Sequence, residues 1–325
     1  MARLATALTA RAPLAQLIEQ AKLVEGLGYD RIWLPEISGR DSFVTGAVVA
    51  TQTNSIDVGL GVVPLPSRPL PALEMATAAL AECAPGRIAV GLGAGHRETA
   101  ASQFGWPGPS TPEAVGDAVV AMREAMRSAT LHHRSAAGEP LILELRGQHV
   151  ETPPELFIGA LRRRMVTVAA RTADGMLLNW VTEHRAARLC ALAAANRTER
   201  RFTAAAYVPV CVVAGSQARE EAYREVAGQL SSYLQLSAYG DLLADDGYAD
   251  DVEAVRAARR DGQNAAAAVS ARLVEAVALI GDADEVKAGL SRLRSAGVDE
   301  PVLAPVTVGA DSAASLFGTW AALAE

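Results

Sequence analysis

The sequence predicts an α/β protein built as a single (β/α)8 barrel. Short, strongly apolar segments alternate with amphipathic helical segments along the 325 residues. This alternation predicts a parallel sheet, and runs that are apolar on both faces are typical of parallel strands buried on both sides. Eight strand candidates follow one another without a break in composition, and a barrel of this kind takes about 250 residues or more. We therefore expect one barrel domain over residues 1–325.

The strand candidates share an apolar run bounded by turn residues. They are Leu4–Thr9, Arg31–Leu34, Ile56–Val63, Arg87–Leu92, Leu156–Gly159, Met176–Trp180, Phe202–Val213 and Pro301–Val308. The third strand contains Gly59 and Gly61. Because a glycine in a buried strand packs no side chain, these two indicate a bulge or the close approach of another group.

Helices are expected between the strands, and several carry terminal signals. Pro13 opens the first helix, which ends at the glycines 26 and 28. Asp41 and Thr111 are placed to cap helices that extend to Thr53 and to about Ala129. The remaining helices are expected over Leu70–Cys83, Met165–Ala173, Glu183–Asn196, Ala283–Ala296 and Ser312–Leu323.

Two segments interrupt the regular alternation. Pro140–Val150, with Arg146-Gly147 at its centre, is predicted to be a small hairpin inserted before the fifth strand. Gln217–Gly297, between the seventh and eighth strands, is rich in alanine, glutamate and arginine. We predict that about residues 217–281 of it form a helical insertion. Its acid-rich part, Asp245–Asp251, is predicted to be a solvated loop rather than a metal site.

Composition argues against several classes of protein. The net charge of −7 disfavours a nucleic-acid partner, which would favour a basic surface. No apolar run reaches the roughly 18 residues of a membrane helix, and the first 12 residues lack the apolar region of a signal peptide. The three cysteines are far apart, as expected of reduced thiols. We expect a cytoplasmic protein with a small-molecule substrate and without a metal or a membrane partner.

The active site of such a barrel lies at the C-terminal ends of the strands. Glu36 follows the second strand, and Arg68 lies in the proline-rich segment after the third. Both are therefore candidates for the barrel mouth, Glu36 for catalysis and Arg68 for the substrate pocket. A surface carboxylate or helix cap is the alternative for Glu36. A rigid loop without a ligand is the alternative for Arg68.

The fourth strand ends in a run of glycines followed by a histidine, Gly91-Leu92-Gly93-Ala94-Gly95-His96. The spacing G-x-G-x-G differs from the dinucleotide fingerprint G-x-G-x-x-G and is a weak signal by itself. Because glycine has no side chain, this segment exposes bare backbone against which a flat ring can lie. His96 is the best placed of the five histidines to act on such a ring, although a lone histidine is more often structural.

Two further strand ends carry candidates. Gly159-Ala160 closes the fifth strand, and the arginines 162–164 follow at a helix N-terminus, an arrangement that suits a phosphate. The alternative is a solvated basic face. After the sixth strand, Trp180 and Thr182 are candidates for the substrate pocket, with a core position as the alternative for Trp180.

Several stretches, in this order and spacing, resemble the luciferase-like superfamily, the bacterial luciferase-type barrels that use FMN or the deazaflavin F420. They lie at residues 21–36, 58–72, 86–95, 153–160, 172–180 and 205–210. The resemblance covers most of the barrel. A helical insertion before the eighth strand also fits this superfamily.

The resemblance implies roles for residues at the strand ends. Gly61-Val62 matches a non-prolyl cis peptide that supports the cofactor ring from behind. Glu36 matches an acidic position near the ring. His96 follows the strand-end segment Gly93-Ala94-Gly95, which is expected to lie against the cofactor, at a position facing the reacting ring. Gly159 and Ala160 match the turn that receives the cofactor phosphate.

The sequence departs from the superfamily pattern at three places. Ile37 stands where some F420-dependent members have a histidine, so an acid–base group there must come from elsewhere. Leu161 and Arg162 replace a usual Gly-Pro, from which we predict that an arginine, Arg164, rebuilds the phosphate contact. Ala84-Pro85-Gly86-Arg87 replaces Ser-Gly-Gly-Arg in a turn.

From this resemblance we expect an F420-dependent oxidoreductase that transfers a hydride between the deazaflavin and a small organic substrate. One alternative is an FMN-dependent monooxygenase that uses oxygen and needs a flavin reductase as partner. Another is a flavin-binding barrel without catalysis. The superfamily also implies a homodimer.

Overall fold

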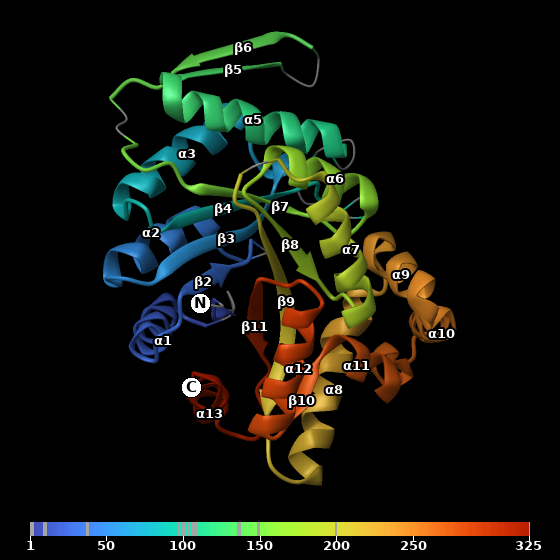
Figure 1. The fold of residues 1–325 in the computed structure, drawn as a ribbon. Coiled ribbons are helices and arrows are strands. Elements are labelled where there is room, and N and C mark those ends of the chain that lie inside the picture. Colours follow the sequence, from blue (N-terminus) through green and yellow to red (C-terminus); the bar gives the residue numbers. More distant parts are fainter. Residues whose placement is uncertain are drawn as a thin grey trace.

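Eight parallel strands close into a barrel in the computed structural model (Figure 1). The structure describes residues 3–8, 12–36, 39–96, 98, 102, 105, 110–134, 138–147, 150–198 and 200–324. Within this part, the strands of the barrel are β1 Ala5–Ala7, β2 Arg31–Leu34, β3 Asp57–Pro64, β4 Ile88–Gly93, β7 Glu155–Gly159, β8 Gly175–Asn179, β9 Thr203–Val212 and β11 Glu300–Pro305. They pair in this order, and parallel pairs β8–β9, β9–β11 and β11–β1 complete the ring. The predicted fold class is confirmed.

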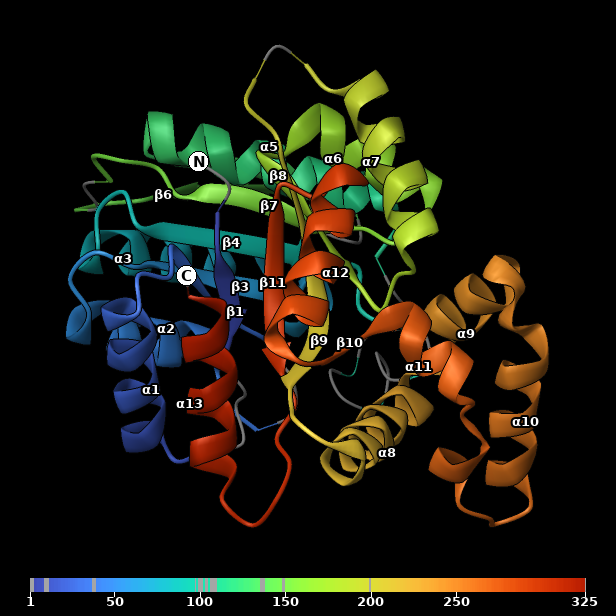
Figure 2. The same cartoon turned by 60° about the horizontal axis from the view of Figure 1, so that its bottom comes forward.

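Helices surround the barrel as its outer layer (Figures 1 and 2). They are α1 Leu14–Gly26, α2 Ser42–Gln52, α3 Leu70–Cys83, α5 Pro112–Ser128, α6 Arg163–Thr172, α7 Glu183–Asn196, α12 Ala283–Ser295 and α13 Ser312–Leu323. The predicted caps are confirmed, because the Asp41 side chain accepts from Val44 N and that of Thr111 from Ala114 N. Thr9 and Ile37 lie outside the described residues.

The hairpin before β7 lies earlier in the chain than predicted. Its strands are β5 Thr130–Arg134 and β6 Pro140–Glu144, which pair antiparallel on the outer side of α5 (Figure 1). Arg146-Gly147 therefore follows the second strand instead of joining the two. The reason is that α5 ends at Ser128, with Ala129 in the left-handed region, which frees the next residues to pair.

The segment between β9 and β11 is a group of helices at one side of the barrel (Figure 2). Its elements are α8 Ser216–Tyr233, α9 Ser237–Leu243, a π-helical turn Ala244–Tyr248, α10 Ala249–Arg260, a 3-10 turn Ala265–Ala268, α11 Ala271–Val277 and β10 Leu279–Gly281. β10 extends the sheet beside β9. These helices bury their own apolar cluster, which reaches the barrel through Trp180, Cys211 and Val306.

The prediction of a solvated loop over Asp245–Asp251 is wrong. These residues form the π-helical turn and the start of α10. The Asp246 side chain is only 3% exposed and pairs with Arg185 on α7 at 2.6 Å. A charge partner on another element, which sequence spacing does not reveal, therefore draws this part of the acidic run into the interior.

The N-terminal end of the barrel is closed by a buried group of charges. The Arg31 guanidinium donates to Glu300 and to Asp57, at 3.2 Å each, and also to Glu155. Trp33 Nε1 donates to the other Glu300 oxygen at 2.7 Å. Burial by itself would lower the pKa of Arg31, but the three carboxylates raise it above its usual value. This end is therefore filled, and only the C-terminal end can admit a ligand.

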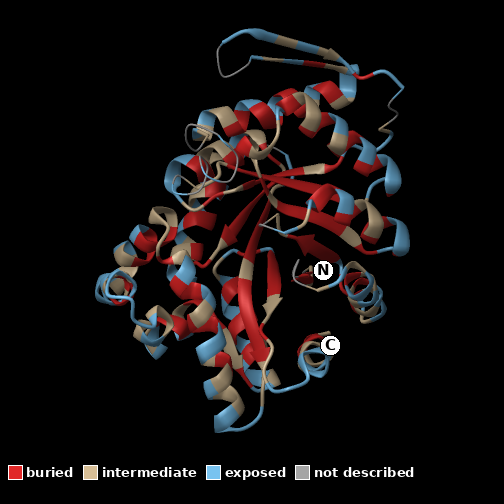
Figure 3. Cartoon of the chain, turned by 180° about the vertical axis from the view of Figure 1, so that it is seen from behind, coloured by how far each residue is buried: buried red, intermediate tan, exposed pale blue. Residues whose placement is uncertain are grey.

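Above these charges the interior is packed by one aromatic pair. The Trp33 ring meets the Phe157 ring edge to face, with 5.1 Å between centroids. Gly59 and Gly175 leave room for these two rings, because a Cβ at either position would lie less than 2.5 Å from a ring atom. The strands form the most buried layer of the molecule (Figure 3). Near the C-terminal end, Gly61 lies against Tyr207 and Trp33, because a Cβ there would be 2.6 Å from the Tyr207 hydroxyl and 2.7 Å from the Trp33 ring.

Candidate active site

The end of β3 forms a floor at the barrel mouth. The Gly61–Val62 peptide is cis, as the resemblance implied. Tyr207 Oη, from β9, donates to the Gly61 carbonyl at 2.7 Å. The partly exposed Val62 side chain lies across the ends of two further strands. Its Cγ atoms are 2.8 Å from the place of a Cβ on Gly93 and 3.0 Å from that of a Cβ on Gly159.

The glycines at these strand ends, Gly93 and Gly159, thus make room for the Val62 side chain. The sequence predicted that a flat ring lies against the backbone near Gly93 and that Gly159 receives a phosphate, whereas the group that approaches both glycines in the structure is Val62 of the same chain. A side chain at Gly93 or Gly159 would displace Val62 and make the floor uneven. The result is a shallow surface of one valine and bare backbone, which a flat ring can cover. Binding of a cofactor here stays a prediction.

His96 stands beside this floor, in the segment after β4. Its neighbour Gly95 has φ +78°, and Pro66 from the β3 segment lies 3.1 Å from the place of a Cβ there. The His96 ring lies 5.7 Å from the ring of Tyr239 on α9. Burial lowers the pKa of His96, and Glu98 only partly opposes this. The imidazole is therefore neutral at pH 7.

The structure brings Glu36 and Arg68 together, and the two side chains form a salt bridge with each other. Arg68 donates to Glu36 at 2.5 Å and to Asp41 at 2.6 Å. Ser42 Oγ donates to the second Glu36 oxygen at 2.5 Å. Arg68 also lies over the Phe43 ring at 5.0 Å. This network joins the segments after β2 and β3 and occupies both charges, so it favours a structural role for both residues.

Trp180 and Thr182 lie at the junction with α8–α11. Trp180 is 4% exposed, has φ +52° and packs on the Tyr233 ring at 5.4 Å between centroids. The Thr182 hydroxyl caps α7 by accepting from Arg185 N and donates to Asp246 at 3.0 Å. A pocket-lining role for Thr182 is not supported, since its hydroxyl is already committed to these two partners.

The α6 N-terminus follows Gly159 and Ala160 as expected, but its arginines point to different partners. Arg164, predicted to contact a phosphate, has a 72% exposed side chain that pairs with Glu113 on α5 at 2.8 Å. Arg162 donates to the Ser237 carbonyl of α9 at 3.3 Å. The first turn of α6 has no side-chain cap from Arg162. A phosphate would therefore meet backbone N–H groups, and Arg164 is the weakest of the predicted site residues.

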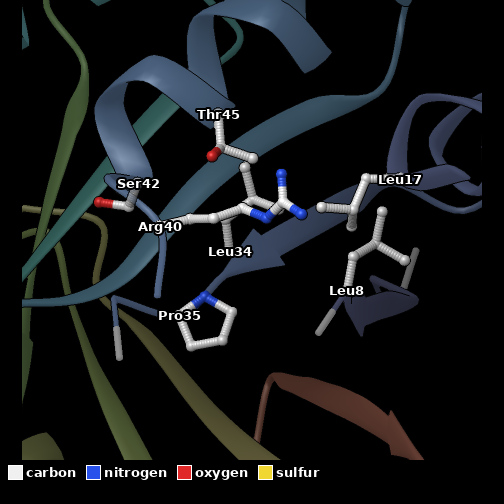
Figure 4. Close-up of a pocket in the computed structure, with 7 residues that line it drawn as sticks. All are labelled: Leu8, Leu17, Leu34, Pro35, Arg40, Ser42 and Thr45. Carbon is white, nitrogen blue, oxygen red and sulfur yellow. The ribbon is translucent and has the colours of Figure 1, made fainter. Parts of the chain in front are cut away.

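A small cavity lies beside the mouth, between the ends of β1 and β2 (Figure 4). Its volume is about 10 Å³, which is room for one water molecule. Leu8, Leu17 and Leu34 form its apolar side, and Arg40 crosses it. The guanidinium of Arg40 donates to the Ala12 carbonyl at 2.6 Å. This cavity is too small for an organic substrate.

The described part of the chain contains no group of three or more His, Cys, Asp or Glu side chains arranged to hold a metal ion. None of its helices has both the length and the apolar character needed to cross a membrane.

Comparison with known protein families gives a match that covers most of the chain. The model of the luciferase-like monooxygenase family matches residues 1–300. The chain belongs to the luciferase-like monooxygenase family. The resemblance of the strand-end motifs is thereby confirmed.

Individual relatives in this family are distant. The 5,10-methylenetetrahydromethanopterin reductase of Archaeoglobus fulgidus is 26% identical over 312 residues, which cover 91% of this chain and 90% of the relative. The enzyme of the same name from Methanolobus tindarius is 27% identical over 179 residues, about half the length of each chain.

Solved structures extend the likeness of fold. The coenzyme F420-dependent tetrahydromethanopterin reductase from Methanopyrus kandleri superposes with a TM-score of 0.84 at 16% identity, covering 100% of this chain and 97% of that one. The oxygenating constituent of 3,6-diketocamphane monooxygenase from Pseudomonas putida, in complex with FMN, gives a TM-score of 0.70 at 15% identity, with 99% and 97% covered.

Tyr207, Tyr233 and Tyr239 were not singled out from the sequence, whereas Asn179 belongs to the strand end at which Trp180 and Thr182 were expected to line a pocket. Tyr207 and Asn179 are inward-facing positions of β9 and β8, so strand alternation gave a usable signal for both. Tyr233 and Tyr239 come from α8 and α9, where helical periodicity does not say which barrel strand they meet. Asn179 Nδ2 donates to Tyr239 Oη at 3.2 Å, which ties α9 to the mouth.

Proposed function

We propose that the protein is an F420-dependent oxidoreductase that transfers a hydride between the deazaflavin and a small organic substrate. The observation that carries the proposal is the flat floor of Val62, Gly93 and Gly159 at the mouth of a luciferase-like barrel. The choice of F420 is supported by the two curated relatives, both methylenetetrahydromethanopterin reductases. It is also supported by the fold shared with the F420-dependent reductase of Methanopyrus kandleri.

The residues at the mouth suit a planar ring that ends in a phosphate. Val62, held by the hydrogen bond of Tyr207 to Gly61, would support the ring from below. Gly93, Ala94 and Gly95 would flank it, and the turn at Gly159-Ala160 would receive the phosphate at the α6 N-terminus. When bound, F420 supplies a hydride donor or acceptor at its C5 carbon.

The proton that accompanies hydride transfer has one well-placed carrier. His96 is neutral, because its pKa is lowered by burial, so one ring nitrogen accepts a proton while the other donates. Glu36 is bound to Arg68 and Ser42 and would act by fixing the mouth rather than by moving a proton. The aromatic side chains of α8 and α9 would exclude water from the ring.

An FMN-dependent monooxygenase is the second candidate. The family description and the shared fold with the FMN-bound diketocamphane monooxygenase constituent support it. In that case the protein would need a flavin reductase as its partner. A homodimer is expected for either candidate.

Titration of the purified protein with F420 and, separately, with FMN tests the choice. We expect saturable binding of F420, seen as a change in its fluorescence, and no binding of FMN. Bound FMN, or oxygen consumption with reduced FMN, would overturn the F420 proposal. Oxidation of reduced F420 in the presence of any member of a substrate panel excludes a barrel without catalysis.

A further inference from the structure

The short helix α9 is held across the barrel mouth from three sides. Glu98, after β4, accepts from Ser237 N at 2.9 Å. Arg162, after β7, donates to the Ser237 carbonyl at 3.3 Å. Asn179, at the end of β8, donates to the Tyr239 hydroxyl at 3.2 Å. Because β7 lies between β4 and β8 in the sheet, α9 spans the end of β7, where Gly159 forms part of the floor.

Through these contacts α9 completes a continuous group of aromatic rings. We call His96, Trp180, Tyr233 and Tyr239 the aromatic wall. Tyr239 meets the Tyr233 ring edge to face at 4.9 Å, and its other neighbour His96 lies at 5.7 Å. Trp180 follows Tyr233 at 5.4 Å. All four side chains are uncharged at pH 7, because His96 is neutral.

The charged side chains that the structure describes around the aromatic wall are bound within the chain. Arg185 pairs with Asp246 at 2.6 Å and donates to the Leu242 carbonyl, while Glu98 and Arg162 bind the first residue of α9. On the other side of the mouth, Glu36 and Arg68 bind each other. A charged substrate group would have to break one of these pairs or lose its hydration without compensation, and both are costly.

The direction of the Tyr239 hydroxyl is set by a hydrogen bond from Asn179. Its oxygen accepts from Asn179, so its own proton is available for a ligand. Burial raises the pKa of Tyr239 well above its ordinary value, and this hydroxyl stays protonated at any working pH.

We propose that the aromatic wall selects an uncharged, planar, unsaturated substrate, and that Tyr239 donates a hydrogen bond to the carbonyl or imine group of that substrate. This inference rests on the proposed function, since it assigns the substrate class of the same site. His96 and Tyr233, the partly exposed rings of the wall, provide stacking surface for a flat ligand, while Trp180 and Tyr239 support them from behind. The oriented hydroxyl defines which end of the ligand faces α9.

Calorimetric titration with cinnamamide and cinnamate tests the proposal, with and without F420. The two probes have the same planar shape and differ in charge. We expect cinnamate to bind at least tenfold more weakly than cinnamamide. Tyr239→Phe keeps the ring and removes the donor, so its cinnamamide affinity should fall about fivefold, the effect of one ordinary hydrogen bond. The control Tyr223→Phe removes an exposed hydroxyl of α8 that donates to Glu275. This variant should bind cinnamamide with the affinity of the parent protein.

Each outcome decides one of the two claims. Equal binding of the two probes, no measurable binding of cinnamamide, or an unchanged affinity in Tyr239→Phe overturns the aromatic-wall proposal, whatever F420 does. Absence of F420 binding, read from F420 fluorescence, overturns the proposed function even when the probe preference holds. Asn179→Ala removes the orienting donor and should lower cinnamamide affinity in the same direction. Thermal unfolding verifies that each variant is folded.

Discussion

At the scale of single residues, the site depends on what each side chain is already bound to. Glu36 and His96 both follow strand ends in the sequence, which made His96 the first and Glu36 the second candidate for a catalytic group. Glu36 is held by Arg68 and Ser42, whereas the described contact of the His96 ring is with the Tyr239 ring. The structure therefore separates the two, and His96 is the residue on which proton transfer should depend.

Replacing His96 with glutamine tests this role. We expect kcat/KM for F420 turnover to fall by about 100-fold or more, the usual contribution of a positioned acid–base group, while F420 affinity changes less than threefold. Because the pKa of His96 is lowered, the parent should lose activity only as the pH falls below the ordinary histidine value of 6.5. His184→Gln, an exposed histidine of α7, serves as the control. A pH profile that is unaltered in the glutamine variant would remove His96 from the mechanism.

The floor offers a second test at this scale. In Gly93→Ala the new methyl group would lie 2.8 Å from Val62 Cγ2, so Val62 must move. We expect a loss of about 1–3 kcal/mol in unfolding free energy and a weaker affinity for F420. Val62→Ala in the same chain should relieve the clash. The measurement is a double-mutant cycle in unfolding free energy, and a coupling below about 0.5 kcal/mol would contradict the packing described here.

At the scale of elements, α3 carries a group that its amphipathic pattern does not explain. Glu74 is fully buried, and neither of its carboxylate oxygens has a hydrogen-bond partner in the described structure. Burial raises the pKa of Glu74 to about 8 from an ordinary value of 4.5. Between pH 4.5 and pH 8, Glu74 is ionised in the unfolded chain but keeps its proton in the folded protein. The folded state is thus penalised as the pH rises.

Glu74→Gln should remove this pH dependence. Relative to the variant, we expect the parent to lose roughly 4 kcal/mol of stability between pH 4.5 and pH 8, with the loss complete above the folded pKa. Denaturant unfolding at several pH values measures the difference. Glu82→Gln, at the exposed end of the same helix, should parallel the parent. Parallel curves for the parent and Glu74→Gln would show that Glu74 is already ionised in the folded protein.

At the scale of the whole molecule, the two ends of the barrel differ in how they are filled. The N-terminal end is closed by Arg31 among three carboxylates, and the C-terminal end is shallow, glycine-rich and covered by α9. Charge concentrated at the closed end holds strands β2, β3, β7 and β11 together. The C-terminal end, between the floor and α9, is where we expect ligands to bind.

Arg31→Met tests the closed end. It leaves buried carboxylates with one cation fewer, so we expect a loss of about 3 kcal/mol or more in unfolding free energy. Arg146→Met removes an exposed arginine that pairs with Glu144, and it should change stability by less than about 0.5 kcal/mol. If Arg31→Met also changed the unfolding free energy by less than about 0.5 kcal/mol, the three carboxylates would not depend on this arginine for stability.

The sequence by itself determined the barrel, most element positions, the glycine-rich strand ends and the luciferase-like family. These features follow from local periodicity, turn residues and short motifs, which depend on neighbours in the chain. Only the tertiary structure decided that Val62 fills the space beside Gly93 and Gly159, that Arg68 neutralises Glu36, and that α9 brings Tyr239 over the mouth. Such contacts join residues between 31 and 97 positions apart, and their partners depend on how the strands and the insertion pack rather than on any local pattern.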